Sequence, residues 1–129
     1  MSRGVLGLGI DVVETERLDQ LMEKSGDAFK RRVFTDAEIE WCEGMANPLL
    51  HFAARFAAKE AASKALGTGI SGGVGWHDLE VVREEDQAPQ LIMHEGALKV
   101  AKRLGVERIL LSLTHTDNYA AASAVAVGD

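Results

Sequence analysis

One alanine-rich segment in the middle of the chain limits most strongly what this sequence can fold into. Residues 52–70 read FAARFAAKEAASKALGTGI, and alanine has the highest helix propensity of all residues. We predict a helix here that is buried on almost all sides. Glu60 and Lys64 stand four residues apart on it, which places both charges on one stripe. Ala53, Phe56 and Ala57 flank that stripe, and the small neighbours let another group approach the two charges closely.

This pair of charges has two interpretations. Glu60 and Lys64 can form a helix-stabilising ion pair, which contributes about 0.2–0.5 kcal/mol. Alternatively, Glu60 binds a divalent metal ion beside a phosphate-binding lysine. Mg²⁺ commonly takes one or two protein carboxylates together with water and substrate phosphates. On that interpretation Glu60 needs only one partner carboxylate, which another part of the chain must supply.

Length and composition narrow the class of protein. The chain has 129 residues, which is typical of one domain, and we treat 1–129 as a single domain. No apolar run reaches membrane-spanning length, and the first residues lack the apolar core of a secretory signal. We therefore expect a cytoplasmic protein without a membrane partner. Cys42 is the only cysteine, so it forms no disulfide within the chain, and we expect an ordinary half-buried thiol.

The charge distribution excludes one class of partner and leaves another open. A net charge of -6 argues against nonspecific nucleic-acid binding, which needs an excess of Lys and Arg. A local basic cluster, Lys30-Arg31-Arg32, stands out, with Arg17 and Lys24 upstream. Such a run is either solvated surface or a docking place for an acidic partner.

The spacing of apolar and turn-forming residues predicts a mixture of short helices and strands, and the fold class is α+β. The glycines of 69–75 predict a mobile loop, and the familiar glycine-rich phosphate loops are absent from the sequence. The expected elements are a strand over 8–13, a helix that Thr15 caps and Gly26 ends, a helix opened by the capping box Thr35–Glu38, the long helix from Pro48 to Gly67, a hairpin of 79–81 and 91–93 with its bend at 84–87, a helix over 97–104, a strand over 109–115, and either a helix or a return strand over 119–127.

Several blocks, in the right order, together resemble the holo-acyl-carrier-protein synthase family. The most specific block is FAAKEAASKALGTG at 56–69, and the similarity extends over nearly the whole chain. The other blocks are GIDVVETERL at 9–18, RVFT at 32–35, WHDLEV at 76–81 and SLTHT at 112–116.

The resemblance implies the 4′-phosphopantetheinyl transferase fold, in which an antiparallel sheet packs on a long central helix, with one domain per chain. It implies an enzyme of fatty acid biosynthesis. Such an enzyme uses Mg²⁺ to move 4′-phosphopantetheine from coenzyme A to a serine of an acyl carrier protein, and it releases adenosine 3′,5′-bisphosphate. The small members of the family are trimers with a site at each interface, so we expect a homotrimer.

The resemblance also assigns roles to residues of this sequence. Asp11 and Glu60 match the two carboxylates that hold Mg²⁺ against the diphosphate of coenzyme A, and Lys64 matches the phosphate-binding lysine. Thr114 and His115 match a Ser/Thr-His pair that reaches the donor from a neighbouring subunit. The residues expected to contact coenzyme A are Arg55, Lys64, Gly67, Thr114, His115 and Thr116. The residues expected to contact the acyl carrier protein are Arg17, Lys30, Arg31 and Arg32.

The chemistry agrees with these residue types. Phosphoryl-type transfer depends on positioning and charge neutralisation more than on covalent catalysis. The attacking serine needs a base, for which Glu60 is the first candidate and Asp11 the second. Lys64 would stabilise or protonate the departing bisphosphate. For His115, a proton carrier and a hydrogen-bond donor to phosphate are both open.

The sequence departs from the family pattern at three places. Val13 stands where larger relatives carry a second acidic residue. Gln87 precedes Ala88-Pro89 where the hairpin usually has Gly-x-Pro, and Asp27 and Ala28 replace cations that often contact the carrier protein.

Two other functions are compatible with the same residues. One is a non-catalytic coenzyme A-binding module, although a pure binder has little need for a metal clamp. The other is a Mg²⁺-dependent hydrolase of nucleotide diphosphates, which would place water where the carrier serine reacts.

Overall fold

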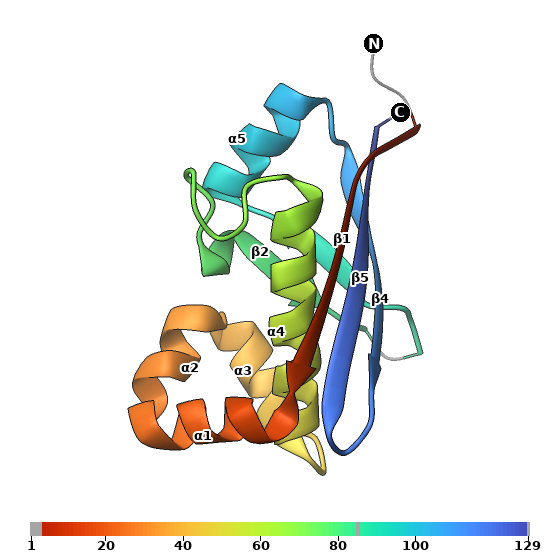
Figure 1. Ribbon diagram of the computed structural model, residues 1–129. Helices are drawn as coiled ribbons and strands as arrows, with labels where there is room; N and C mark the ends of the chain where they lie inside the picture. Colours follow the sequence, from red (N-terminus) through yellow and green to blue (C-terminus); the bar gives the residue numbers. More distant parts are fainter. Residues whose placement is uncertain (1–3, 85, 129) are drawn as a thin grey trace.

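A single long helix, α4, organises the fold (Figure 1). The computed structural model describes residues 4–84 and 86–128. The elements in chain order are β1 (Gly4–Glu14), α1 (Thr15–Ser25), α2 (Asp27–Val33), α3 (Asp36–Glu43), α4 (Pro48–Ala65), the short 3₁₀ helix η1 (Trp76–Asp78), β2 (Leu79–Val82), β3 (Gln90–Met93), α5 (Glu95–Leu104), β4 (Arg108–His115) and β5 (Tyr119–Gly128).

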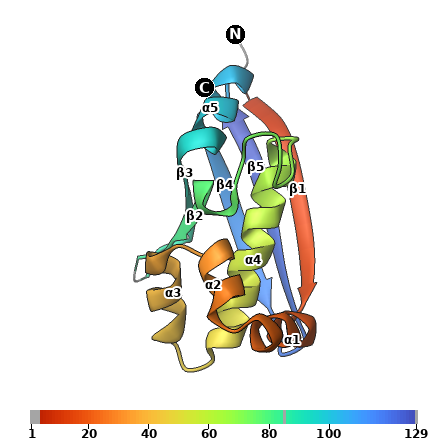
Figure 2. The ribbon, with the colours of Figure 1, turned by 90° about the vertical axis from the view of Figure 1, so that its left-hand side faces the viewer.

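The sheet against which α4 packs is antiparallel, with the strand order β1-β5-β4. A second, two-stranded sheet of β2 and β3 contacts another side of α4 (Figure 2). Helices α1, α2 and α3 gather at one end of the molecule, and α5 lies at the other (Figure 1). This arrangement confirms the expected α+β class, with an antiparallel sheet on a long central helix.

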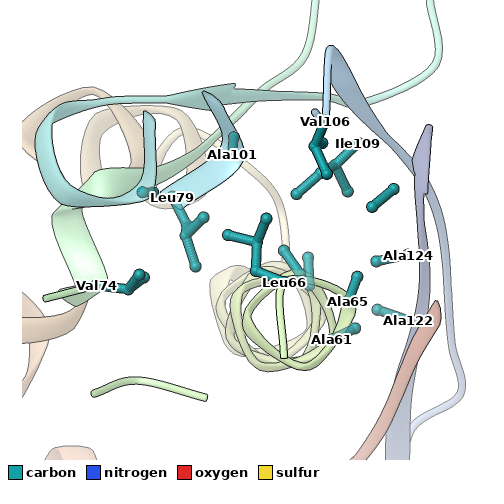
Figure 3. Packing of buried hydrophobic residues seen from close by; sticks show 14 of the residues in the cluster. Ala61, Ala65, Leu66, Val74, Leu79, Ala101, Val106, Ile109, Ala122 and Ala124 are labelled. Atoms are coloured by element: carbon teal, nitrogen blue, oxygen red, sulfur yellow. The ribbon is translucent and has the colours of Figure 1, made fainter. Parts of the chain in front are cut away.

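Alanine dominates the contact between α4 and the sheet. Ala61 and Ala65 of α4 face Ala122 and Ala124 of β5, and all four are buried (Figure 3). Because a methyl group is the largest side chain on either surface here, the helix lies close to the strands. The small size of these residues therefore determines how near the α4 backbone comes to the sheet.

The helical end of the molecule is attached by larger side chains. Leu18 of α1, Phe29 and Val33 of α2, and Phe34 pack with Phe52 of α4 in a second buried cluster. The rings of Phe34 and Phe52 lie 5.0 Å apart between centroids. This cluster fixes α1 and α2 against the first half of α4.

A buried ion pair ties α3, α4 and β2 together. Lys59 Nζ lies 2.7 Å from Glu38 Oε1, and both side chains are fully buried. Lys59 Nζ also donates to the carbonyl oxygens of Trp76 and Leu79, at 3.0 and 2.8 Å. Glu38 Oε2 accepts from the backbone N–H of Val81 at 2.8 Å. Burial lowers the pKa of Lys59, and the adjacent Glu38 carboxylate counteracts this.

Several sequence expectations are confirmed. Thr35 and Glu38 form the predicted capping box at the start of α3, with both reciprocal hydrogen bonds present. The hairpin, the helix over 97–104 and the strand over 109–115 are all found. Residue 85, which lies in the expected bend, is outside the described residues.

Other expectations are corrected by the structure. The long helix ends at Ala65, so residues 66–70 are not helical. Thr15 is the first residue of α1 rather than its cap, and its Oγ1 donates to the carbonyl oxygen of Asp117 at 2.7 Å. The ambiguous segment 119–127 is a strand, β5. The segment around the basic cluster is the helix α2, which we did not predict.

None of the helices in the described ranges combines the length and the apolar character that a membrane span requires.

Candidate functional site

The strand β1 and the helix α4 bring Asp11, Glu60 and Lys64 together. Residues 8, 10 and 12 of β1 are exposed, and Asp11 lies on the opposite face, toward α4. Lys64 extends from α4 to this strand, where its Nζ donates to the carbonyl oxygen of Ile10 at 3.0 Å and to Asp11 Oδ1 at 3.3 Å. Glu60, one turn earlier on α4, lines the same cleft as Asp11.

These contacts argue against a simple helix pair between Glu60 and Lys64. Within the described residues, the ion pair that Lys64 makes within 4 Å is with Asp11 rather than with Glu60. Lys64 therefore bridges the helix and the strand. Glu60 remains a second carboxylate beside the bridge.

The surroundings of Glu60 disfavour its negative charge unless a cation is bound nearby. Burial raises the pKa of Glu60 above its ordinary value, and the negative charge of Asp11 raises it further. The positive charge of Lys64 counteracts part of this rise. A cation between the two carboxylates would relieve their repulsion.

The donor atoms present here suit Mg²⁺. Two carboxylates at one cleft, with open space for water and phosphate oxygens, are a set of ligands that Mg²⁺ accepts. Across residues 4–84 and 86–128, no group of three or more His, Cys, Asp and Glu side chains is arranged to hold a metal ion. The cleft thus offers an open two-carboxylate site rather than a closed protein cage.

The cleft beside Asp11 and Glu60, which we call the carboxylate cleft, has a volume of about 320 Å³. Its lining combines polar and apolar side chains from β1, α1 and α4. The lining residues are Asp11, Val12, Val13, Glu14, Arg17, Leu18, Leu21, Phe56 and Glu60. The ring of Phe56 stacks on that of Trp76, with 5.2 Å between the ring centroids.

A second cleft, which we call the basic cleft, has a volume of about 280 Å³. Its lining comes from the first half of α4, the end of the β2–β3 hairpin and the end of β4. The lining residues are His51, Ala54, Arg55, Arg83, Leu113, Thr114 and His115. The positive and imidazole groups among them make this a candidate site for an anion.

Arg55 carries the strongest indication of a ligand in the basic cleft. Its side chain is 2% exposed, and its guanidinium carbon lies 3.8 Å from the centre of the Trp41 ring. Within the described residues, its buried Nε and Nη2 atoms have no hydrogen-bond partner. Buried donors without a partner are destabilising, so a ligand that accepts from them would be bound well.

Sequence reasoning missed two residues of the basic cleft. His51 precedes Arg55 by one helical turn, and its ring lies 5.6 Å from that of His115. Burial lowers the pKa of His51, and the neighbouring His115, Arg55 and Arg83 lower it further. The i, i+4 spacing of His51 and Arg55 could have indicated the first of these residues. The sequence gives no comparable signal for Arg83.

The predicted site residues therefore fall into two groups in one chain. Asp11 and Glu60 line the carboxylate cleft, whereas Arg55, Thr114 and His115 line the basic cleft. As far as the chain is described, the two linings have no residue in common.

Gly67 and Thr116 line neither cleft. Gly67 follows α4 with a φ of 80°, and its N–H donates to the carbonyl oxygen of Lys64 at 2.9 Å. Thr116 Oγ1 accepts from the N–H groups of Asn118 and Tyr119 in the turn between β4 and β5. Their observed contacts are with the backbone.

Cys42 is fully buried rather than half-buried. Burial raises the pKa of its thiol to about 12, so it is not a nucleophile at neutral pH.

The basic cluster Lys30-Arg31-Arg32 lies on α2 with unequal exposure. Lys30 Nζ is 3.1 Å from Glu43 Oε2 and also lies over the ring of Phe52, 5.2 Å from its centre. Arg31 and Arg32 are exposed, and the ion pair that Arg31 makes with Asp27, at 3.8 Å, is itself exposed. The two arginines are thus the members of the cluster that are available to a partner.

The face of the main sheet that points away from α4 is apolar and uncovered in the single chain. Leu8, Ile10 and Val12 of β1 are 61–70% exposed, and Leu110 of β4 is 49% exposed. Strand pairing places Leu8 and Leu110 in one row across β5, and Val12 and Thr114 in another. Large exposed apolar patches of this kind are typical of interaction surfaces.

Comparison with known proteins gives consistent results. The family model of the 4′-phosphopantetheinyl transferase superfamily matches residues 7–124. A holo-[acyl-carrier-protein] synthase of Koribacter versatilis is 51% identical over 121 residues, which cover 94% of this chain and 97% of that protein. The crystal structure of holo-[acyl-carrier-protein] synthase from Neisseria meningitidis has a TM-score of 0.88 at 32% identity, covering 95% of this chain and 98% of that one.

A second solved structure, a holo-(acyl-carrier-protein) synthase from Bacillus anthracis, is described as a complex with CoA (3′,5′-ADP). It has a TM-score of 0.80 at 31% identity, and the match covers 97% of this chain and 98% of that one.

Proposed function

Because the chain belongs to the 4′-phosphopantetheinyl transferase superfamily, as a holo-acyl-carrier-protein synthase, we propose that it moves phosphopantetheine from coenzyme A to a carrier serine with Mg²⁺. The observation that carries this proposal is that Asp11 shares one cleft with Glu60 and is also the ion-pair partner of Lys64. Lys64 and Asp11 meet although 53 residues separate them in the sequence.

Asp11 and Glu60 are the residues that would hold Mg²⁺ in the carboxylate cleft. When bound, Mg²⁺ supplies positive charge that neutralises the diphosphate of coenzyme A. Lys64 adds a positive charge beside Asp11, with its Nζ 3.3 Å from Asp11 Oδ1. Arg17, at the rim, lies where the carrier protein would approach.

The transfer step forms one bond and breaks another. The serine oxygen of the carrier attacks the phosphorus that bears pantetheine, and the bridging P–O bond of the diphosphate breaks. Adenosine 3′,5′-bisphosphate leaves with the bonding electron pair. Glu60 is our first candidate to accept the serine proton, and Asp11 is the second. Lys64 stabilises the charge that develops on the departing phosphate.

The basic cleft is the place that we assign to the remaining phosphate of coenzyme A, at the 3′ position of its ribose. A phosphate dianion accepts several hydrogen bonds, and the buried guanidinium of Arg55 offers two donors without a partner in the described chain. His115, Thr114 and His51 lie around the same space. In this assignment His115 is a donor to phosphate rather than a proton carrier.

A homotrimer would bring the two clefts together across an interface. One molecule of coenzyme A needs both the carboxylate cleft and the basic cleft, and these have separate linings in one chain. The exposed apolar face of β1 and β4 is a surface that association would cover. Thr114 lies on this face, in one row with Val12, the neighbour of Asp11.

A cytoplasmic location and a role in fatty acid biosynthesis remain predictions from the sequence and its family. The non-catalytic module is disfavoured, since coenzyme A binding alone has no need for two repelling carboxylates.

Mass spectrometry tests the proposed reaction directly. An apo-acyl carrier protein is incubated with coenzyme A, Mg²⁺ and this protein, and the mass of the carrier is measured. We expect a gain equal to one phosphopantetheine group, and no gain when EDTA removes Mg²⁺. Free phosphopantetheine without carrier modification would identify a hydrolase instead. Coenzyme A binding without either product would identify a binding module.

The exposed arginines of α2 should govern the encounter with the carrier. Replacing Arg31 and Arg32 with alanine should raise the Michaelis constant for an acidic carrier roughly two- to thirtyfold at low salt, because each of the two exposed contacts contributes about 0.2–1 kcal/mol. The effect should shrink as salt screens the charges. Steady-state kinetics at several salt concentrations measures both quantities.

A matched control is the replacement of Lys99 and Lys102, two exposed cations of α5, at the other end of the molecule (Figure 1). This variant loses the same charge but should keep the normal Michaelis constant. Equal effects of both variants would mean that net charge, and not the α2 surface, determines carrier binding.

A further inference from the structure

Two glycines of β1 have no room for a side chain, and this bears on the carboxylate cleft. We propose that Gly7 and Gly9 are positioning residues, which let the backbone of β1 lie against the backbone of α4 and thereby set Asp11 beside Glu60 and Lys64. This inference rests on the proposed function, because it concerns the residues assigned to Mg²⁺.

The space at both glycines is closed by backbone atoms. A Cβ on Gly9 would lie 1.8 Å from the carbonyl oxygen of Ala61, and one on Gly7 would lie 2.0 Å from that of Ala65. Real Cβ atoms essentially never come within 3.0 Å of another heavy atom in this way. Because helix backbone cannot rotate aside as a flexible side chain does, a methyl group here must separate β1 from α4.

Conformation does not explain these glycines. Seven glycines of the described chain have a positive φ, but Gly7 and Gly9 are not among them. Both lie within the extended strand β1, a conformation that any residue adopts. At Gly9 the requirement is therefore for space. Gly7 needs the same space and also adjoins an irregularity in the pairing of β1 with β5, between Val5 and Gly7.

The geometry of the two elements connects the glycines to Asp11. Two residues along a strand advance by about 6.7 Å, and four residues along a helix advance by about 6 Å. The spacing of Gly7 and Gly9 along β1 thus matches the spacing of Ala65 and Ala61, which lie one helical turn apart on α4. Asp11 is the next residue on the same strand face, so its approach to α4 is set by the contacts of the glycines.

The bonds of Lys64 depend on the same close approach. Its Nζ reaches the backbone carbonyl of Ile10, between Gly9 and Asp11, at 3.0 Å. The neighbouring strand β5 also has small side chains at the paired positions. The residues that pair with Gly7, Gly9 and Asp11 are Ala126, Ala124 and Ala122. A shift of β1 by about 1 Å is enough to lower a reaction rate by a factor of roughly 10² when it displaces a catalytic group.

The test uses Mn²⁺ binding, measured by electron paramagnetic resonance of the free ion, as a readout apart from activity. Gly9→Ala should raise the Mn²⁺ dissociation constant by about 10- to 100-fold, the usual effect of losing support for metal ligands. Gly7→Ala, one step further from Asp11, should show a smaller rise, and it also serves if Gly9→Ala does not fold. A folded variant of either kind whose Mn²⁺ affinity stays within about twofold of normal would overturn the proposal.

Two controls distinguish a specific role of the glycines in positioning Asp11 from a general loss of stability of the fold. Gly44→Ala adds the same methyl group where its nearest neighbours lie 3.5 Å away, and it should bind Mn²⁺ normally. Val100→Ala removes packing from the buried face of α5, and it should lower the melting temperature without weakening Mn²⁺ binding. If Val100→Ala weakens Mn²⁺ binding as much as Gly9→Ala does, the positioning role is wrong.

A third variant distinguishes failure of this inference from failure of the proposed function. Asp11→Ala removes a proposed ligand and should abolish Mn²⁺ binding. If it binds Mn²⁺ like the unmodified chain, the metal site itself is misassigned, and the positioning proposal falls with it. If Asp11→Ala loses Mn²⁺ while Gly9→Ala and Gly7→Ala keep it, only the positioning proposal falls.

Discussion

Glu60→Gln should lower the rate of phosphopantetheine transfer by at least about 100-fold. The substitution keeps the shape of the side chain but removes the charge that, with Asp11, would hold Mg²⁺. Loss of one preorganised electrostatic contact typically has an effect of this size. The rate is measured at saturating coenzyme A and carrier over a range of Mg²⁺ concentrations. Glu107→Gln, at an exposed position outside both clefts, is the matched control.

Although Glu60→Gln should lower the transfer rate, it should not lower the stability of the metal-free chain. In the metal-free chain the pKa of Glu60 is raised above its ordinary value of 4.5, so the protonated side chain is favoured by the fold. This stabilisation is present below the ordinary pKa and is lost as the pH rises through the raised pKa. At pH 7 the charge is therefore unfavourable, and Glu60→Gln should unfold at the same or a slightly higher temperature in EDTA.

The simple helix pair makes a different prediction. If Glu60 served only as a partner of Lys64, Gln would lower stability by about 0.5 kcal/mol and leave turnover nearly normal. Near-normal turnover at saturating Mg²⁺, together with a lower melting temperature, would therefore remove Glu60 from the metal site.

How far the fold follows from sequence depends on the length of each periodic segment. The α4 segment is long and rich in alanine, so its helix is predictable. Helix α2 has seven residues, and its only apolar spacing is Phe29 with Val33, which is too little to distinguish a helix from a charged loop. The alanines of β5 favour a helix by propensity, but the packing of Ala122 and Ala124 against α4 decides for a strand.

The candidate site was predictable as a set of residues but not as an arrangement. The resemblance to a family selected Asp11, Glu60 and Lys64, and the structure brings them together. It also selected Arg55, which is five residues from Glu60 and so points about 140° away around α4. The partners of Arg55 in the basic cleft come from the hairpin and from β4, and such long-range contacts have no signature in a single sequence.

Because the two clefts have separate linings in one chain, we expect a second large effect: trimers assembled from two inactive variants should regain activity. Asp11→Ala damages only the carboxylate cleft and His115→Ala only the basic cleft, so each variant should be nearly inactive alone. In the proposed homotrimer every interface joins two different faces, as in any cyclic assembly. An interface then works only when a His115→Ala chain supplies the carboxylate cleft and an Asp11→Ala chain supplies the basic cleft.

Random assembly of equal amounts gives each of these requirements a chance of one half, so about a quarter of the sites should recover activity. The two variants are mixed, allowed to exchange subunits, and assayed after native mass spectrometry has confirmed mixed trimers. A mixture of unmodified chains with Asp11→Ala measures whether exchange itself changes activity. If each site lay within one chain, no mixture of the two variants could contain an intact site. Activity that stays at the level of the single variants in confirmed mixed trimers would therefore contradict the shared site.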